Sequence, residues 1–114
     1  MTTTLNSFKS ETQLGTTATD LASTSNAEKA FIGKATFTNT SASNVVVTVY
    51  RLPTTSTETA GVGGNWSVSR TVPAGKTWIC NEIIGQSLGH SMTLSATADT
   101  ASVINADISG TLEV

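Results

Sequence analysis

The sequence has few of the residues that cross-link a chain or carry out chemistry. Among its 114 residues there is one cysteine and one histidine, and charged side chains make up 12%. One cysteine excludes a disulfide within the chain, and one histidine excludes the histidine clusters that bind zinc. Because aromatic residues make up only 5%, the chain must fold mainly by packing aliphatic side chains.

Charge of either sign is scarce, and the sequence has no long apolar run. The net charge is −2 and the isoelectric point is near 5.1, so no basic surface is available to attract nucleic acid. No apolar run is long enough to cross a membrane, and residues 1–17 lack the charged and apolar regions of a secretory signal. We therefore expect no nucleic-acid or membrane partner, and synthesis in a reducing cytoplasm.

Threonine and serine supply most of the polarity, and valine and isoleucine accompany them. Threonine, valine and isoleucine are β-branched and favour strands. Disorder is the alternative for such a chain, but disorder requires low hydrophobicity with high net charge. The mean hydropathy of +0.03 allows a packed core, and the length suits one domain. The composition thus predicts a single all-β domain.

Alternation of apolar and polar residues marks the expected strands. In segment 31–39, Phe31, Ala35 and Phe37 fall on one face. Segment 45–52 alternates in the same way after a short polar loop. Two alternating segments joined by turn-forming residues predict a β-hairpin.

Other segments repeat this pattern. Segments 91–98 and 103–114 predict a second hairpin built like the first, and segments 65–72 and 76–80 predict two strands joined by a tight turn at 73–75. With two weaker candidates near the N-terminus, the count is about seven or eight short strands, which is typical of a sandwich.

Two connecting segments have no clear period. Segment 54–64 is polar and rich in glycine and threonine, so we expect an exposed loop. Segment 81–89 fits either a single helical turn ended by Gly89 or an apolar plug, formed by its isoleucines and Leu88, that closes one end of the sandwich.

The predicted fold is an all-β, antiparallel β-sandwich of jelly-roll type. Residues 1–19 are expected to form an extended N-terminal arm with a first weak strand. Residues 20–114 are expected to form the β-sandwich domain.

The reactive residues form no recognisable catalytic pattern. His90 stands at a turn without a second histidine, and Cys80 lies in an alternating strand, where a lone cysteine is usually a small buried hydrophobe. There is no G-x-S-x-G nucleophile motif and no calcium-binding loop, and the glycines of 61–64 lack the Lys-Thr pair of a phosphate-binding loop. The sequence therefore predicts no catalytic residue, no metal site, no cofactor and no enzyme activity.

Three side chains are candidates for binding a partner. Leu5 and Phe8 lie in the expected arm and would anchor it on a neighbouring molecule; the alternative is that they cover the edge of the sandwich's own core. Trp66 follows the glycine-containing loop, and tryptophan is frequent at interface hot spots. The alternative for Trp66 is a core position.

Three segments resemble a known family. They are IGKATFTNTSASNVVVTVYRLP (32–53), TVPAGKTW (71–78) and EIIGQSLGHSMTLSATADTASVINADISGTLEV (82–114). From about Phe31 to Val114 the chain resembles the small β-sandwich virion proteins of tailed bacteriophages, which include capsid decoration (cement) proteins. It departs from the family where relatives often read G-D-x-I, at 89–92, and where they often repeat P-A-G-K-x, at 26–30. The resemblance implies a jelly-roll or similar sandwich, assembly as small oligomers and no catalytic residues.

The resemblance also gives the expected function. It implies a capsid decoration protein that binds the outside of the head shell and stabilises it by bridging neighbouring capsid subunits. Its partners would be the major capsid protein and other copies of itself, as a dimer or trimer, and its place would be the exterior of the virion. The alternative is a tail, neck or fibre-associated module that recognises a host-surface glycan or a virion partner.

Overall fold

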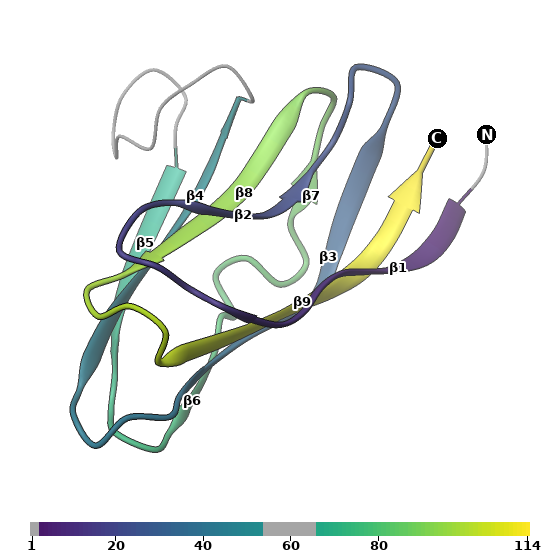
Figure 1. The fold of residues 1–114 in the computed structure, drawn as a ribbon. Helices are drawn as coiled ribbons and strands as arrows, with labels where there is room; N and C mark the ends of the chain where they lie inside the picture. The colour runs from purple at the N-terminus through teal and green to yellow at the C-terminus, as the bar shows by residue number, and fades with distance from the viewer. Residues whose placement is uncertain (1–2, 54–65) are drawn as a thin grey trace.

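The computed structural model describes residues 3–53 and 66–114 (Figure 1). Within these residues the chain forms nine strands and no helix, so the predicted all-β class is confirmed. The strands are β1 (Thr3–Gln13), β2 (Thr19–Ser23), β3 (Lys29–Asn39), β4 (Val45–Pro53), β5 (Trp66–Val72), β6 (Thr77–Ile79), β7 (Ser87–Leu88), β8 (Met92–Ala98) and β9 (Ile104–Glu113). The count exceeds the prediction because the two-residue β7 lies in the segment expected to be a turn or plug.

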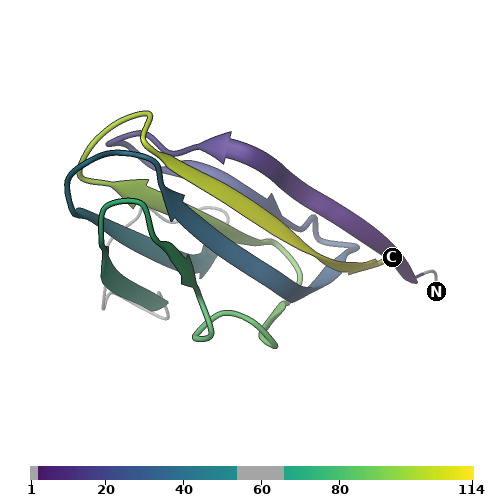
Figure 2. The ribbon, with the colours of Figure 1, turned by 90° about the horizontal axis from the view of Figure 1, so that it is seen from below.

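The strands form two antiparallel sheets that pack as a sandwich (Figure 1, and Figure 2 from below). The first sheet has the order β1-β9-β3-β6, with β7 also paired to β3, and the second has the order β2-β8-β4-β5. Successive strands alternate between the sheets except at β4–β5 and β6–β7. This is the strand order of a jelly roll with β7 as an addition, so the predicted sandwich is confirmed.

Both predicted hairpins are wrong, because the two strands of each lie in different sheets. β3 pairs with β6, β7 and β9, whereas β4 pairs with β5 and β8. The loop between β3 and β4 therefore carries the chain from one sheet to the other, and the loop between β8 and β9 does the same. Alternation shows which side chains face the core, but it does not show which strand is the neighbour.

The predicted tight turn after β5 is confirmed. The Lys76 N–H donates to the carbonyl of Pro73 at 3.0 Å, and Gly75 has a φ of 71°. A positive φ costs glycine nothing because it has no Cβ. The turn leads from the second sheet into the first.

The segment between β6 and β8 supplies the predicted apolar plug. The Ile83 N–H donates to the carbonyl of Cys80 at 3.1 Å, and the resulting turn ends at Gly85, which has a φ of 88°, not at Gly89. Ile83 and Leu88 are fully buried. The Ile84 N–H also donates to the Cys80 carbonyl, at 3.1 Å, so the segment contains a single helical turn as well as the plug, and the turn ends four residues earlier than expected.

The N-terminal segment forms an edge strand of the first sheet. β1 pairs with β9 from Thr3, opposite Glu113, to Gln13, opposite Asn105. Phe8 is partly buried and packs against the core. The expected arm and the expected sandwich domain therefore share one sheet.

Aliphatic side chains from both sheets fill the core. Each such side chain contributes about 1.5–3 kcal/mol when it is fully buried. Phe37 adds an aromatic contact, because its ring centroid lies 5.3 Å from that of Trp78. The largest fully buried side chains are Phe37, Leu14, Leu21, Ile32, Leu52, Ile83, Leu88, Leu94, Ile104, Ile108, Val45 and Val47.

Asn39, the last residue of β3, ties the two sheets together at a corner. Its side chain is fully buried, and Nδ2 donates to the carbonyls of Ser43 (2.7 Å) and Val72 (2.9 Å). Its Oδ1 accepts from the Ser41 N–H (2.9 Å) and hydroxyl (2.7 Å). Since Val72 ends β5, one amide joins a strand of the first sheet, the loop after it and a strand of the second sheet.

Replacing Asn39 by alanine should lower the free energy of unfolding by about 2–4 kcal/mol, because it leaves buried carbonyls without their donor. Asn44→Ala is the matched control. Asn44 is exposed in the same loop and accepts one bond from the Ala74 N–H at 3.3 Å, so its loss should cost less than about 1 kcal/mol. Urea unfolding followed by tryptophan fluorescence measures both. Equal losses would contradict the role of Asn39.

Candidate functional site

The two outer faces of the sandwich differ in chemistry. On the first sheet Leu5, Phe31 and Ile79 are exposed, at 89%, 46% and 55%. Among the described strands of the second sheet the exposed large apolar side chain is Val46, and hydroxyls are frequent there, such as the Thr48–Ser69 pair at 2.8 Å. Exposed apolar side chains that gather on one face mark a surface for binding.

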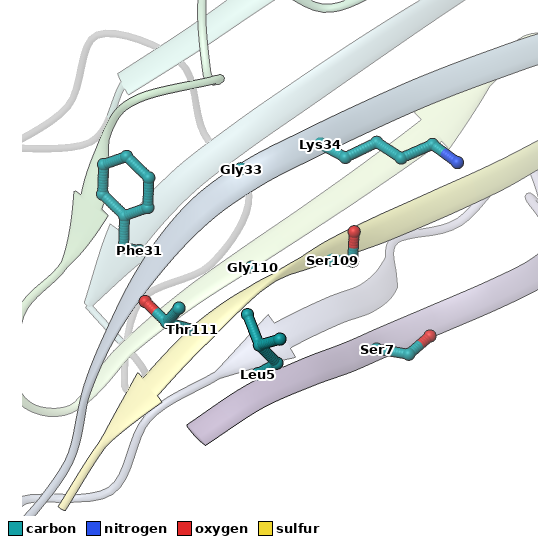
Figure 3. Close-up of a pocket in the computed structure, with 8 residues that line it drawn as sticks. All are labelled: Leu5, Ser7, Phe31, Gly33, Lys34, Ser109, Gly110 and Thr111. Carbon is teal, nitrogen blue, oxygen red and sulfur yellow. The ribbon is translucent and has the colours of Figure 1, made fainter. Parts of the chain in front are cut away.

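The sheet register places Leu5 and Phe31 in one row. Both lie opposite Thr111 of β9, Leu5 on the β1 side and Phe31 on the β3 side. Side chains directly opposite each other on one face have Cβ atoms about 4.5–5.5 Å apart. Figure 3 shows the leucine and the phenylalanine on either side of the threonine.

A β-bulge in β3 turns Phe31 outward. The register shifts at Gly33, which is the extra residue of the bulge. Ala35 and Phe37 follow the bulge and are fully buried, whereas Phe31 precedes it and is exposed. The expectation that these three residues share one face is therefore wrong, because one inserted residue reverses the alternation.

Two glycines form the floor of a groove beside these apolar side chains. A Cβ on Gly110 would lie 1.8 Å from the carbonyl oxygen of Phe31, so a side chain does not fit there. A Cβ on Gly33 would meet the Gly110 Cα at 3.7 Å, an ordinary contact. The groove has a volume of about 520 Å³ and is lined by Leu5, Ser7, Phe31, Gly33, Lys34, Ser109, Gly110 and Thr111 (Figure 3). We call it the Leu5–Phe31 groove.

Charged residues lie at both ends of this groove. At one end the Lys34 Nζ lies 2.9 Å from the Asp107 carboxylate, and both side chains are partly exposed. At the other end Lys29 lies opposite Glu113 in the register. The groove itself is apolar with a hydroxyl rim, which suits a protein surface better than a small charged ligand.

The structure separates the three residues predicted to bind a partner. Leu5 lines the groove and is 89% exposed. Phe8 packs against the core, which agrees with the alternative that it covers the edge of the sandwich's own core. Trp66 begins β5 with its backbone opposite Arg51; its side chain and the predicted loop at 54–64 lie outside the described residues.

Leu5 is the one groove residue that the sequence predicted, and Phe31, Gly33 and Gly110 are the missed residues that give the groove its wall and floor. A signal for them was present, because a glycine inside an alternating strand often marks a bulge or a close backbone approach. Both Gly33 and Gly110 interrupt such strands.

His90 stands at the predicted turn, between β7 and β8. It is exposed and lines a shallow hollow with Ala27, Lys29, Glu113 and Val114, none of which is buried. Among the residues that the structure describes, no group of three or more His, Cys, Asp or Glu side chains could hold a metal ion. In the same residues, no helix has the length and apolarity needed to cross a membrane.

Comparison with protein-family models, with curated proteins and with solved structures gives no match to this chain.

Cys80 is fully buried in the core, as predicted, and burial raises the pKa of its thiol from 9.0 to about 11. We expect native Cys80 to react with a disulfide reagent at pH 8 at least about 100-fold more slowly than the unfolded chain, because the thiolate is the reactive form.

The same pKa shift makes the free energy of unfolding depend on pH. It should fall as the pH rises from about 9 towards 11, since the thiol of the unfolded chain ionises first. Labelling kinetics and melting temperatures against pH, with Cys80→Ala as control, measure both effects. Rapid native labelling would contradict the prediction.

Gly110→Ala should destabilise the fold by about 2–4 kcal/mol, because the new Cβ collides with the β3 backbone and must push the strands apart. Gly33→Ala is the matched control on the same groove floor. It should cost less than about 1 kcal/mol, since its Cβ finds ordinary contact distances. Chemical unfolding of both variants is the measurement. A similar loss in both would mean that the close approach of β3 and β9 is not what requires glycine.

Proposed function

We propose that this chain is a bacteriophage capsid decoration protein that binds the outside of the head shell and stabilises it by bridging neighbouring capsid subunits. The resemblance over residues 31–114 suggests the family. The observation that carries the proposal is the Leu5–Phe31 groove, an apolar surface on one outer face of a rigid jelly roll. In this role the chain acts by binding rather than catalysis, and its partners are the major capsid protein and other copies of itself.

The exposed apolar side chains support assembly. Covering a side chain such as Leu5 removes apolar area from water, which contributes roughly 25 cal/mol per Å². An exposed side chain of this kind has little value to an isolated molecule, but it contributes to every contact in a repeated array. The hydroxyls around the groove and the Lys34–Asp107 ion pair provide the polar rim that protein interfaces usually have.

Stabilisation of a shell by such a protein follows from mass action. A protein that binds the assembled shell and not the separated subunits stabilises the assembly by RT ln(1 + [L]/Kd) at each site. A copy that contacts two neighbouring subunits holds the second contact at high effective concentration. Weak contacts that are repeated over the shell therefore stabilise the whole assembly.

The pairing of β1 with β9 determines how the N-terminal segment should be tested. Deleting residues 1–10 would remove Phe8 from the core and leave most of β9 without its β1 neighbour. A loss of binding would then report unfolding as well as contact. A substitution at Leu5, which is 89% exposed, changes the surface and leaves the sheet intact.

Leu5→Asp should weaken binding to bare head shells by at least about tenfold, because a carboxylate replaces an apolar contact in the groove, with the shell or with a neighbouring copy on it, and must be desolvated. Val46→Asp, on the outer face of the second sheet, is the matched control and should bind like the wild type. Pelleting the shells and quantifying the bound copies measures the affinity, and melting temperatures show that both variants are folded. Wild-type protein that stays in the supernatant, or Leu5→Asp at full occupancy, would contradict the proposal.

A further inference from the structure

We infer that the outer face of the first sheet binds a second copy of this chain, face to face. The two copies are related by a two-fold axis that lies in the interface between them, runs parallel to the strands and passes above the line between β3 and β9. The pairing itself does not depend on the proposed function. Only its use as the bridge between capsid subunits rests on that function.

The charges on this face are sorted by strand. Both charged residues of β3 are lysines, Lys29 and Lys34, and both charged residues of β9 are acidic, Asp107 and Glu113. Lys29 lies opposite Glu113 in the register, and Lys34 donates to Asp107 at 2.9 Å. A positive strand therefore lies beside a negative strand, and the Leu5–Phe31 groove lies between the two charge pairs.

This arrangement is complementary to itself in one orientation. An axis parallel to the strands turns the face over and places β3 of one copy over β9 of the other, at the same level. Lys29 then faces the partner's Glu113, and Lys34 faces the partner's Asp107. An axis in the sheet plane but perpendicular to the strands would place β3 over β3 and set lysine against lysine, which is unfavourable.

The apolar side chains fit the same orientation. Phe31 would lie over the partner's Thr111, and Leu5 would lie over the partner's β7, which pairs with Phe31 in the same row. Each copy thus covers Leu5 and Phe31 of the other, and the two glycine floors face each other. A two-fold interface requires such self-complementarity.

The face is large enough for a stable dimer. The molecule measures 45 × 30 × 20 Å along its principal axes. Standard protein interfaces bury roughly 800 Å² on each partner, with an apolar centre and a polar rim. A sheet face of this size offers an area in that range, with the groove toward the Lys29 end of β3 and charged residues on both sides of the groove.

Charge reversal on the complete chain tests the pairing. Lys29→Glu with Lys34→Glu makes both strands acidic, so we expect the dimer measured by sedimentation equilibrium to weaken at least about tenfold. Adding Asp107→Lys and Glu113→Lys to that variant exchanges the signs of the two strands and keeps the pairs within each copy. This exchanged variant should dimerise like the wild type. Lys76→Glu, an exposed lysine in the β5–β6 turn, is the control and should leave the dimer unchanged.

Mixing the exchanged variant with the wild type tests the orientation. With the parallel axis the mixed pair sets like charges against each other, so the two proteins should form separate homodimers. Free exchange between them would favour the perpendicular axis and overturn the proposed orientation. Melting temperatures establish that each variant is folded.

Two results would overturn the pairing altogether: wild-type protein that stays monomeric up to submillimolar concentration, or an acidic variant that dimerises as tightly as the wild type. These outcomes are independent of shell binding. A monomer that still decorates shells would refute the pairing alone, and a dimer that ignores shells would refute the proposed function alone.

Discussion

The packing of aliphatic side chains between the two sheets is the interaction on which the rest of this structure depends. A chain with one cysteine has no disulfide to hold its sheets together, and neither sheet can bury its inner face without the other. Asn39 joins the two sheets at one corner of the sandwich, and Ile83 and Leu88 form the buried plug. Because this core is rigid, the outer faces are fixed surfaces, and binding to them costs little ordering entropy.

The bulge at Gly33 converts an ordinary strand into part of a binding surface. It lets β3 place Phe31 outside and Ala35 inside within a few residues. Gly110, on the neighbouring strand, permits the close backbone approach that the bulge creates. The exposed position of Phe31 and the glycine floor of the groove follow from this one irregularity.

Alternation in the sequence was enough to predict the all-β class and the positions of most strands, because every second side chain of a strand points to the same face of the sheet. It could not predict strand partners, since a hairpin and a loop that crosses between sheets have the same pattern on either side. It also failed at Phe31, because an inserted residue reverses the faces beyond it. Leu5 remains a candidate from the sequence that the structure places in the groove, whereas Phe8 packs against the core. The role of Trp66 stays a prediction.

The position of β9 has a consequence for the synthesis of the chain. β9 follows the other described strands in the sequence, yet it lies between β1 and β3, which come from the first part of the chain. β1 therefore cannot pair with β9 until residues 104–113 have left the ribosome, and forming contacts between residues so far apart in the sequence is slow. During that interval the inner faces of the early strands are open to other nascent chains. Rapid completion of translation, or a chaperone that shields these strands, thus becomes a condition for a good yield of folded protein.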